Sequence, residues 1–415
     1  MSRPLVIVVS SGYHLYRQYL LAGISANARI WLLLATEPSW EAQYIEGWTK
    51  VDTLDAAAVV AAGRQITAQH EVSGVICWDE LRTINAARLA EALGLPGGHA
   101  DAIVRCRDKH LTRQSLDAAG VVQPTSRAVN NETNAVAVAN EIGYPVVVKP
   151  RGLGASIGVS RVDDDAQLIA AYRHASKAFE DGVPPNDSVL IEQCIVGEEI
   201  SIDSAIVGGM VQPLFIARKM LGFEPHCEEI GHVVDGADPL LTDPALIDLL
   251  QRAHSAVGYQ TGITHTEVML TSSGPQVIEI NSRYGGDLIP YVASIAAGLD
   301  PGRIAVEVAV GQRPNTSRTQ CQVARVDFWY PDTDVTVEQI TISPGPCPPG
   351  VDRIVALAQP GQVLQLPPAG HVASRYGYIV TYGPTSAHCA QAAELARPLI
   401  QLSSHRLSPC AGAPA

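Results

Sequence analysis

The sequence predicts a mixed α/β and α+β protein, and three features lead to this fold class. Over about the first hundred residues, short apolar runs of strand length alternate with helical patterns, which is the βαβ rhythm of a parallel sheet. In the middle of the chain, strands follow one another through tight turns, as in antiparallel hairpins. The chain has 415 residues, of which 47% are hydrophobic and 17% charged, so it can bury a large core and form several domains.

The N-terminal unit carries the parallel-sheet pattern. Buried strands are predicted at Leu5–Val9, Ile30–Leu34 and Val75–Trp78. Residues 81–93 repeat apolar side chains at helical spacing and then stop at Gly94, which is typical of a helix end. No Gly-x-Gly-x-x-Gly motif follows the first strand, so no dinucleotide site is predicted.

Two further units mix helices with strands. In the first, helices are predicted at 111–119, from the cap Asn131 to Gly143, and at 166–180, with strands at Pro145–Lys149 and 188–195. The second begins with a hairpin over 199–216 about Gly208-Gly209 and continues with a helix over 244–257, an acidic hairpin over 262–283 and a helix after Asp300-Pro301.

The texture of the chain changes after about residue 315. A loop rich in proline and glycine covers 343–350, a strand 376–382 and a helix 386–401 follow, and the tail from Ser403 is expected to be disordered. The predicted domains are an N-terminal α/β domain (1–103), a small domain (104–195), a large domain (196–314), a C-terminal α+β subdomain (315–404) and a tail (405–415).

Composition excludes several classes of protein. A net charge of −13 argues against nucleic acid or an anionic membrane as the main partner. The eight cysteines show no Cys-x-x-Cys and no zinc spacing, so buried reduced thiols are expected. The first apolar run is too short for a secretory signal, and no stretch has the length of a membrane span. A soluble cytoplasmic enzyme is therefore the expectation.

The acidic hairpin is the most informative segment. If its turn is centred on Ser273, Glu267 faces Glu279 and His265 faces Asn281, and all four side chains share one face. Facing carboxylates repel unless a cation lies between them, and Mg²⁺ with a nucleotide phosphate suits oxygen ligands. The alternative is a solvated face with scattered acids, because a register slip of one residue undoes the pairing. Val268, Leu270, Ile278 and Ile280 are expected on the core face.

Three other segments have the chemistry of a nucleotide site. Lys149 ends a buried strand and is followed by the glycine-rich loop 151–158, which suits phosphate; a flexible hairpin tip is the alternative. The strand through Glu192 could offer its backbone edge to adenine, and Glu199 could take ribose hydroxyls; otherwise both are surface acids. Arg283, followed by Gly285-Gly286, could hold a phosphoryl group or simply pair with a neighbouring acid.

In their order along the chain, the four segments resemble the ATP-grasp superfamily over about 104–311. Within it, the resemblance is closest to the L-amino acid ligases that make dipeptides and peptide antibiotics. The resemblance extends to Leu93-Gly94-Leu95-Pro96-Gly97 in the N-terminal domain and to the C-terminal module around 377–381. It implies an ATP-grasp fold with an N-terminal parallel-sheet (pre-ATP-grasp) domain and a small C-terminal α+β module. The small domain would then be the lid and the large domain the catalytic one.

The resemblance also implies roles in binding ATP. Lys109 and Lys149 would be the lysines that bind the α- and β-phosphates, and loop 151–158, with Gly154 and Ser156, would be the lid over these phosphates. Glu192, Gln193 and Ile195 would form the adenine hinge, and Glu199 would be the ribose carboxylate. Glu267 and Glu279 would coordinate two Mg²⁺ ions, for which Mn²⁺ can substitute, and Asn281 would assist, although this position is often no ligand in the dipeptide ligases. Arg283 and the Gly286 backbone would stabilise the acyl-phosphate and the tetrahedral intermediate.

A substrate pocket follows from the same resemblance. Lys219, Glu229 and His232 would line the amino-acid site, with a surface loop carrying a satisfied histidine as the alternative. Asp287 stands where such ligases limit the size of the first amino acid, often with a bulky aromatic residue, so we consider that it receives a substrate cation.

The expected function is ATP-dependent ligation of two amino acids through an acyl-phosphate, with release of ADP and phosphate, in the biosynthesis of peptide antibiotics. Alternatives are a ligase with a carrier-protein or other acceptor, a carboxylase that uses carboxyphosphate, and a non-catalytic nucleotide-binding module. Small amino acids are the expected partners, and the family habit of dimers suggests a homodimer.

Overall fold

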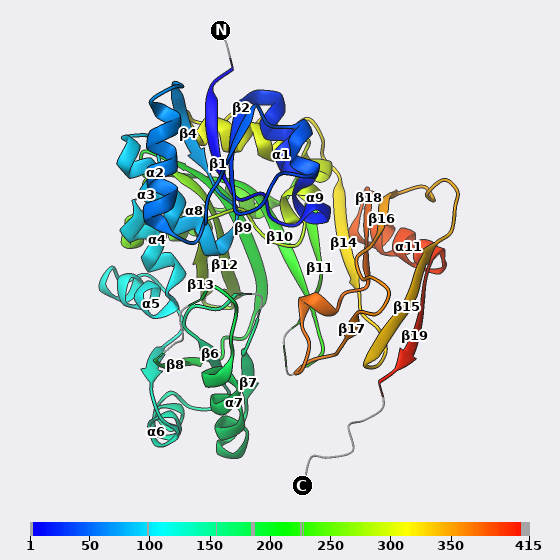
Figure 1. Cartoon of the computed structure of the whole chain (residues 1–415). Helices are drawn as coiled ribbons and strands as arrows, with labels where there is room; N and C mark the ends of the chain where they lie inside the picture. Colours follow the sequence, from blue (N-terminus) through cyan, green and yellow to red (C-terminus); the bar gives the residue numbers. More distant parts are fainter. Residues whose placement is uncertain are drawn as a thin grey trace.

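The computed structural model describes residues 3–97, 99–154, 156–183, 187–224, 226 and 228–407. Within them the strands form four sheets, of four, eight, three and four strands (Figure 1). No described helix is both long and apolar enough to cross a membrane.

The N-terminal domain is built on a parallel sheet, as predicted. Its strands, in the spatial order β3-β2-β1-β4, are β1 (Leu5–Val9), β2 (Arg29–Leu34), β3 (Gly47–Lys50) and β4 (Val72–Ile76), and its helices are α1 (His14–Asn27), α2 (Ala56–Thr67) and α3 (Thr83–Leu93). Val6 and Val8 of β1 pack into a core that includes α1, whereas Leu5, Ile7 and Val9 pack into a core with α2 and α3. Helices therefore cover both faces of this sheet.

Two strands of this domain differ from the prediction. The strand β4 ends at Ile76, so the range Val75–Trp78 lay too late in the chain. Trp78 is buried beyond the strand end, where its indole Nε1–H donates to the Ser11 carbonyl at 3.1 Å, and apolar character alone could not separate it from the strand. The edge strand β3 was not predicted, since Gly-Trp-Thr-Lys contains no apolar run.

The small domain has an antiparallel sheet with helices packed on it. Its strands, in the order β5-β8-β6-β7, are β5 (Ser126–Val129), β6 (Val146–Pro150), β7 (Ser160–Val162) and β8 (Val189–Gln193). Its helices are α6 (Glu132–Ile142) and α7 (Asp165–Lys177), and α4 (Ala100–Arg107) and α5 (Lys109–Ala118) lead into it. The predicted Asn131 cap is confirmed, because its side chain accepts from the Asn134 N–H at 2.8 Å.

The largest sheet runs through the large domain and into the C-terminal part. Its order is β13-β12-β9-β10-β11-β14-β18-β16. The strands are β9 (Glu198–Val207), β10 (Met210–Gly222), β11 (Glu228–Asp235), β12 (Gly262–Thr271), β13 (Gly274–Asn281), β14 (Val323–Trp329), β16 (Val351–Ala356) and β18 (Gly377–Gly383), with helices α8 (Pro244–Val257), α9 (Ile289–Ala297) and α10 (Pro301–Ala309). The predicted hairpin about Gly208-Gly209 and the two Asp-Pro helix starts are confirmed.

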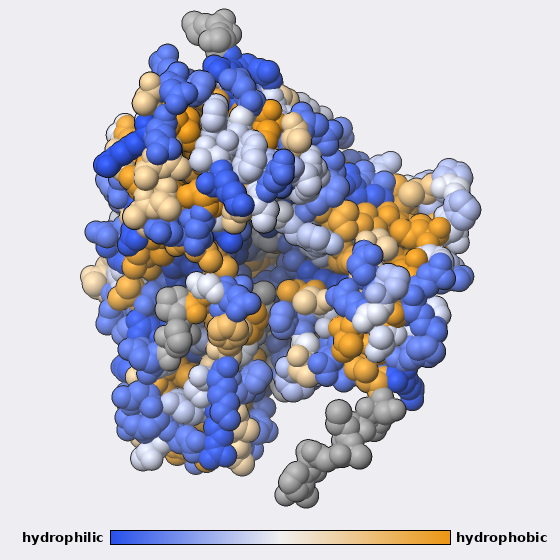
Figure 2. All heavy atoms as spheres, in the orientation of Figure 1, coloured by the Kyte–Doolittle hydropathy of each residue, from blue (hydrophilic) through white to orange (hydrophobic). Residues whose placement is uncertain are grey.

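The C-terminal module adds a small sheet of β15 (Val335–Ile342), β17 (Val363–Leu364) and β19 (Ile400–Arg406), beside α11 (Ser386–Ala396). The predicted helix 386–401 is too long: α11 ends at Ala396, and Pro398 in the following turn cannot continue the hydrogen-bond ladder. The strand β19 pairs with β15, so the expected disorder from Ser403 is wrong up to Arg406; residues 408–415 lie outside the described residues. In the space-filling view, hydrophobic residues gather on this module (Figure 2).

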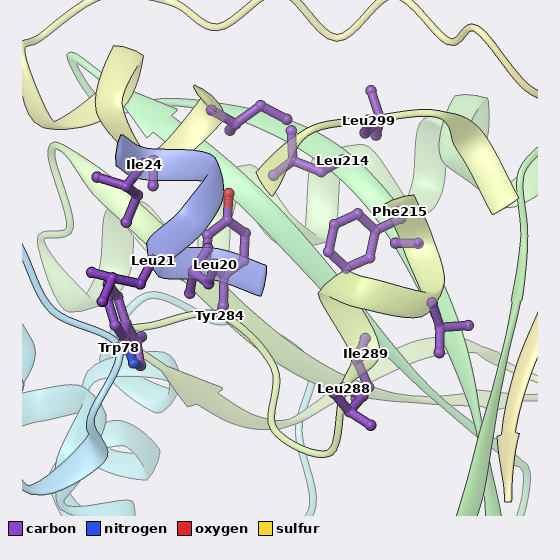
Figure 3. Packing of buried hydrophobic residues seen from close by; sticks show 14 of the residues in the cluster. Leu20, Leu21, Ile24, Trp78, Leu214, Phe215, Tyr284, Leu288, Ile289 and Leu299 are labelled. Carbon is purple, nitrogen blue, oxygen red and sulfur yellow. The ribbon is translucent and has the colours of Figure 1, made fainter. Parts of the chain in front are cut away.

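One core joins the N-terminal domain to the large domain (Figure 3). Leu20, Leu21 and Ile24 of α1 are fully buried in it, and each such side chain contributes about 1.5–3 kcal/mol. Helix α1 crosses α10 closely: a Cβ at Gly23 would lie 3.2 Å from the Gly302 Cα, so both glycines are needed there. The two domains are thus firmly attached, which places residues of α1 beside the loop formed by residues 283–287.

Candidate active site

The paired carboxylates take the predicted register. In the hairpin of β12 and β13, Glu267 stands opposite Glu279 and His265 opposite Asn281. The two glutamates keep 17% and 16% of their side-chain surface exposed, whereas His265 and Asn281 are buried. The hairpin therefore presents two facing, accessible carboxylates on one face.

A bulge changes the other face. The register shifts between Glu267 and Val268, and Val268 then faces Val277. Val277 enters the core together with Ile280, while Ile278 stays partly exposed, so the prediction of Ile278 as a core residue is wrong. In a bulge two residues oppose one, and the alternation of faces slips by one position.

Each glutamate has a lysine as its neighbour. The Lys109 Nζ lies 3.0 Å from Glu279 Oε1 and donates to the Leu153 carbonyl at 2.7 Å, so this buried lysine joins the metal hairpin to the glycine-rich loop. Lys109 was expected at the phosphates, and its position between the loop and a metal acid suits that role.

Lys219 connects three acids that the sequence assigned to different ligands. Its Nζ lies 2.5 Å from Glu199 Oε1, 3.1 Å from Glu229 Oε1 and 3.4 Å from Glu267 Oε2. Burial alone would lower the pKa of Lys219, but the three carboxylates raise it well above its usual range. The acids predicted to bind ribose, substrate and metal therefore lie around one cation, and the role of Lys219 in the substrate site stays a prediction.

Lys149 is held by a buried carboxylate. Its Nζ lies 2.6 Å from Glu192 Oε2, and Glu192 also accepts two bonds from Arg113, at 2.7 and 3.0 Å. Burial would raise the pKa of Glu192, but Arg113 and Lys149 lower it far below its usual range. Burial lowers the pKa of Lys149. The Glu192 carboxylate therefore stays charged and is occupied by its contacts with Lys149 and Arg113.

The segment predicted as the adenine hinge is largely paired within the sheet. The strand β8 lies between β5 and β6, so its backbone is not an exposed edge. The Gln193 N–H donates to Thr125 and the Cys194 N–H to Pro145, at 2.8 and 3.3 Å. Because both edges of β8 are paired, the backbone from Ile195 onward is the part of the expected hinge that remains available.

The glycine-rich loop connects β6 to β7 beside Lys109. A Cβ at Gly154 would meet nothing within 4 Å, so the backbone there is open to a ligand. Ser156 has φ +56° and accepts from the Val159 N–H at 3.1 Å, which closes a tight turn. Ala155, within the same loop, lies outside the described residues.

Arg283 follows the hairpin and meets the N-terminal domain. It pairs with Glu80, which also accepts from Arg107 at 2.8 Å. Burial would raise the pKa of Glu80, but Arg283 and Arg107 lower it to about 2. The alternative prediction for Arg283 was an ion pair with a neighbouring acid. Its partner Glu80 is distant in the chain, and this pair orients the guanidinium at the cavity wall.

A buried dyad holds the loop that contains Gly286. His265 Nδ1 and Asp203 Oδ1 lie 2.6 Å apart, and the other Asp203 oxygen accepts from the Gly285 N–H at 2.8 Å. Burial would lower the pKa of His265, but Asp203 and Glu267 raise it to about 9. A charged His265 beside Glu267 thus connects the metal hairpin to the catalytic loop.

Asp287 is paired within the protein, and its expected role in receiving a substrate cation stays a prediction. Arg375 of the C-terminal module donates two bonds to it, at 2.6 and 2.8 Å, and also donates to the Glu229 carbonyl at 2.9 Å. His232 Nε2 lies 3.4 Å from both Glu229 and Asp287, so these two pocket residues do come together as predicted. The backbone of Asp287 is left-handed, with φ +48°, and the ion pair holds it there.

A cavity of about 700 Å³ opens beside these residues. Its walls come from α1, the Arg283–Asp287 loop and the C-terminal module, and it is lined by aromatic, charged and small side chains, among them Tyr13, Tyr16, Arg17, Trp78, Glu80, Glu180, Arg283, Gly286, Asp287 and Arg375. The volume suits small-molecule ligands.

Sequence reasoning missed several residues of the site. Arg113 is four residues after Lys109 on α5, a spacing that places both on one helix face and could have revealed it. Glu80, Asp203 and Arg375 look like ordinary surface or strand residues until the fold brings them to the site.

Comparison with known proteins agrees with this geometry. A family model described as "ATP-grasp domain" matches residues 142–291. The D-alanine--D-alanine ligase of Pseudomonas entomophila (strain L48) is 31% identical over 222 residues, which cover 51% of this chain and 67% of that protein. The chain belongs to the ATP-grasp superfamily. It is a carboxylate–amine ligase of the ADP-forming type.

Two other known proteins are similar to this chain. The alanine--anticapsin ligase of Bacillus subtilis (strain 168) is 26% identical over 252 residues, which cover 55% of this chain and 52% of that protein. The crystal structure of an L-amino acid ligase from Bacillus licheniformis superposes with a TM-score of 0.79 at 21% identity, over 98% of this chain and 100% of that one. This likeness shows the fold and confirms the expected N-terminal sheet domain and C-terminal module.

The residues present fit ATP with Mg²⁺. Glu267 and Glu279 offer facing carboxylate oxygens, which Mg²⁺ prefers, and Asn281 stays a predicted ligand beside them. Lys109 and Lys219 neutralise the two glutamates, and both lysines carry flexible side chains that can turn toward phosphate oxygens. Bound there, the metal would offset the charge of the phosphates.

Proposed function

We propose that this enzyme joins two amino acids, or an amino acid and a related amine, into an amide through an acyl-phosphate. The observation that carries the proposal is the junction of two sites. The facing Glu267–Glu279 pair lies on the hairpin whose next residues, Arg283 to Asp287, form a wall of the 700 Å³ cavity. A nucleotide phosphate and a small carboxylate can therefore meet at this loop.

The proposed reaction follows from the charges of the chain. Lys109 and Lys149 bind phosphate oxygens, while Glu192 holds Lys149 in place. The substrate carboxylate takes the γ-phosphoryl group, and Arg283 offsets the charge of the acyl-phosphate. When the amine attacks, the C–N bond forms, the bond from the acyl carbon to the phosphate oxygen breaks, and the amine loses a proton. The Gly286 backbone and Arg283 stabilise the oxyanion.

The lining of the cavity and the similarity to known ligases support amino-acid substrates. Trp78, Tyr16 and Tyr13 form an aromatic part of the wall, and Glu229 with His232 lies next to it behind Asp287. The relatedness to D-alanine--D-alanine ligase and alanine--anticapsin ligase, both named for amino-acid substrates, points the same way. Peptide antibiotic biosynthesis as the pathway, two Mg²⁺ ions with Mn²⁺ as substitute, and a homodimer remain predictions.

The test is ATP consumption against a matrix of amino-acid pairs, with ADP, AMP and phosphate resolved and products weighed by mass spectrometry. The expected result is ADP and phosphate with particular pairs only, and a product lighter than the two substrates by one water. Formation of AMP would overturn the acyl-phosphate route. No turnover with any pair would overturn the amino-acid substrates.

A further inference from the structure

The charges that line the cavity are mostly paired. Arg283 is bound to Glu80 and Arg375 to Asp287. The third arginine of the lining, Arg17, forms no ion pair with any described residue. Its guanidinium donates to the Gly285 carbonyl at 3.5 Å and lies beside the Tyr19 hydroxyl.

The position of Arg17 is built into the start of α1. Gly12 has φ +72°, and a Cβ there would lie 3.1 Å from the Arg17 Cγ and 3.5 Å from the Trp78 Nε1. The side chain thus lies against Gly12 and points along the cavity wall toward the catalytic loop. A half-buried guanidinium without a carboxylate partner in the described residues is available to an anionic ligand.

The reaction requires two carboxylates if both substrates are amino acids. The first is converted to an acyl-phosphate and then to an amide, so it needs the phosphate-binding residues. The second carboxylate, on the amino acid that supplies the amine, keeps its charge throughout. A carboxylate that leaves water for a protein cavity loses hydration, and a cation in the cavity wall offsets this cost.

We infer that Arg17 binds the carboxylate of the amine-supplying substrate, and that this substrate is therefore a free amino acid rather than a polyamine, an amino sugar or a carrier protein. The inference rests on the proposed function and names its acceptor class. Glu180, a lining carboxylate that also forms no ion pair among the described residues, leaves a place for an ammonium group in the same cavity.

The experiment compares two forms of one acceptor, the free acid and its carboxamide, with a donor that gives ADP in the amino-acid matrix. The wild-type enzyme should prefer the acid by about 10- to 100-fold in kcat/KM, because a charge-assisted bond to the guanidinium is lost with the amide. Arg17→Ala should lose most of this preference by a rise in acceptor KM, with the KM for ATP unchanged. Arg17→Lys should retain part of it, and its activity shows that the fold is intact.

Arg64→Ala is the matched control, since Arg64 is exposed on α2 of the same domain and does not line the cavity. It should keep the wild-type preference. If the wild-type enzyme used acid and amide alike, or if Arg17→Ala kept the full preference, the role of Arg17 would be refuted while ligase activity stood. If no amino-acid pair released ADP, both the proposed function and this inference would fall.

Discussion

The Glu192 carboxylate offers a sharp test of the reasoning, because it holds two buried cations at once. It is 3% exposed and lies 2.6 Å from Lys149, while Arg113 donates to both of its oxygens. The substitution Glu192→Gln keeps the shape of the side chain and removes the charge. Lys149 and Arg113 are then left close together with no anion between them.

The magnitude follows from the geometry. At 2.6 Å, the Lys149–Glu192 attraction is about 6 kcal/mol for an effective dielectric constant of about 20, and desolvation offsets much of it. Breaking a buried ion pair by removing one partner costs about 3–5 kcal/mol of unfolding free energy. Burial already lowers the pKa of Lys149, so without Glu192 this lysine is less often charged. The KM for ATP should rise by about tenfold or more.

The chain contains a matched control. Arg173 and Glu132 form the same two bonds, also at 2.7 and 3.0 Å and also in the small domain, but on the surface. Urea unfolding of Glu192→Gln and Glu132→Gln, together with ATP titration of each, separates burial from bond geometry. Glu132→Gln should change stability and KM little, since exposed pairs contribute little. Equal destabilisation by both variants, or an unchanged KM for ATP in Glu192→Gln, would refute the reasoning.

Four further outcomes are expected. Glu279→Gln should reduce Mg²⁺-dependent ADP release by more than about 100-fold, because the metal contributes several kcal/mol to phosphoryl transfer; near-normal turnover would remove it from the metal site. Glu199→Ala should mainly raise the KM for ATP, and an unchanged KM would end its ribose role. Arg375→Ala should lower the unfolding free energy by about 3–5 kcal/mol, because Asp287 loses its bidentate partner; thermal melts check this. Burial lowers the pKa of His254 from 6.5 to about 4. The neutral histidine therefore contributes up to about 3 kcal/mol to the free energy of unfolding above pH 6.5, and this contribution is lost as the pH falls toward 4. Urea unfolding at pH 7 and pH 5 should show a smaller pH dependence of the unfolding free energy for His254→Gln than for the wild-type enzyme.

Local patterns located the acidic hairpin but not the centre of its turn. The ladder beside the turn pairs Thr271 with Gly274, so its centre lies between Ser272 and Ser273, and Glu267 faces Glu279 only because the bulge shifts the register by one residue. Helix starts at Asn131, Asp243 and Asp300 were predictable from the sequence, since a cap depends on residues within one turn.

Where a residue's environment depends on distant strands, the local reading failed. Glu192 has the pattern of a half-exposed strand, yet β8 lies inside its sheet and the side chain is buried against Arg113. The bulge that moved Val277 into the core arises from pairing between strands, and no periodicity within one strand reveals it.

By itself, the sequence determined the parallel N-terminal sheet, the facing acids of the hairpin, the lysine before the glycine-rich loop and, through its resemblance, the superfamily. These depend on contacts within about twenty residues or on motifs read directly. Only the tertiary structure decided that Glu80 holds Arg283, that Arg375 holds Asp287 and that Arg17 lines the cavity without an ion pair to any described residue. Such pairs join separate domains, and their energies arise from burial and proximity, which exist only after the domains have packed.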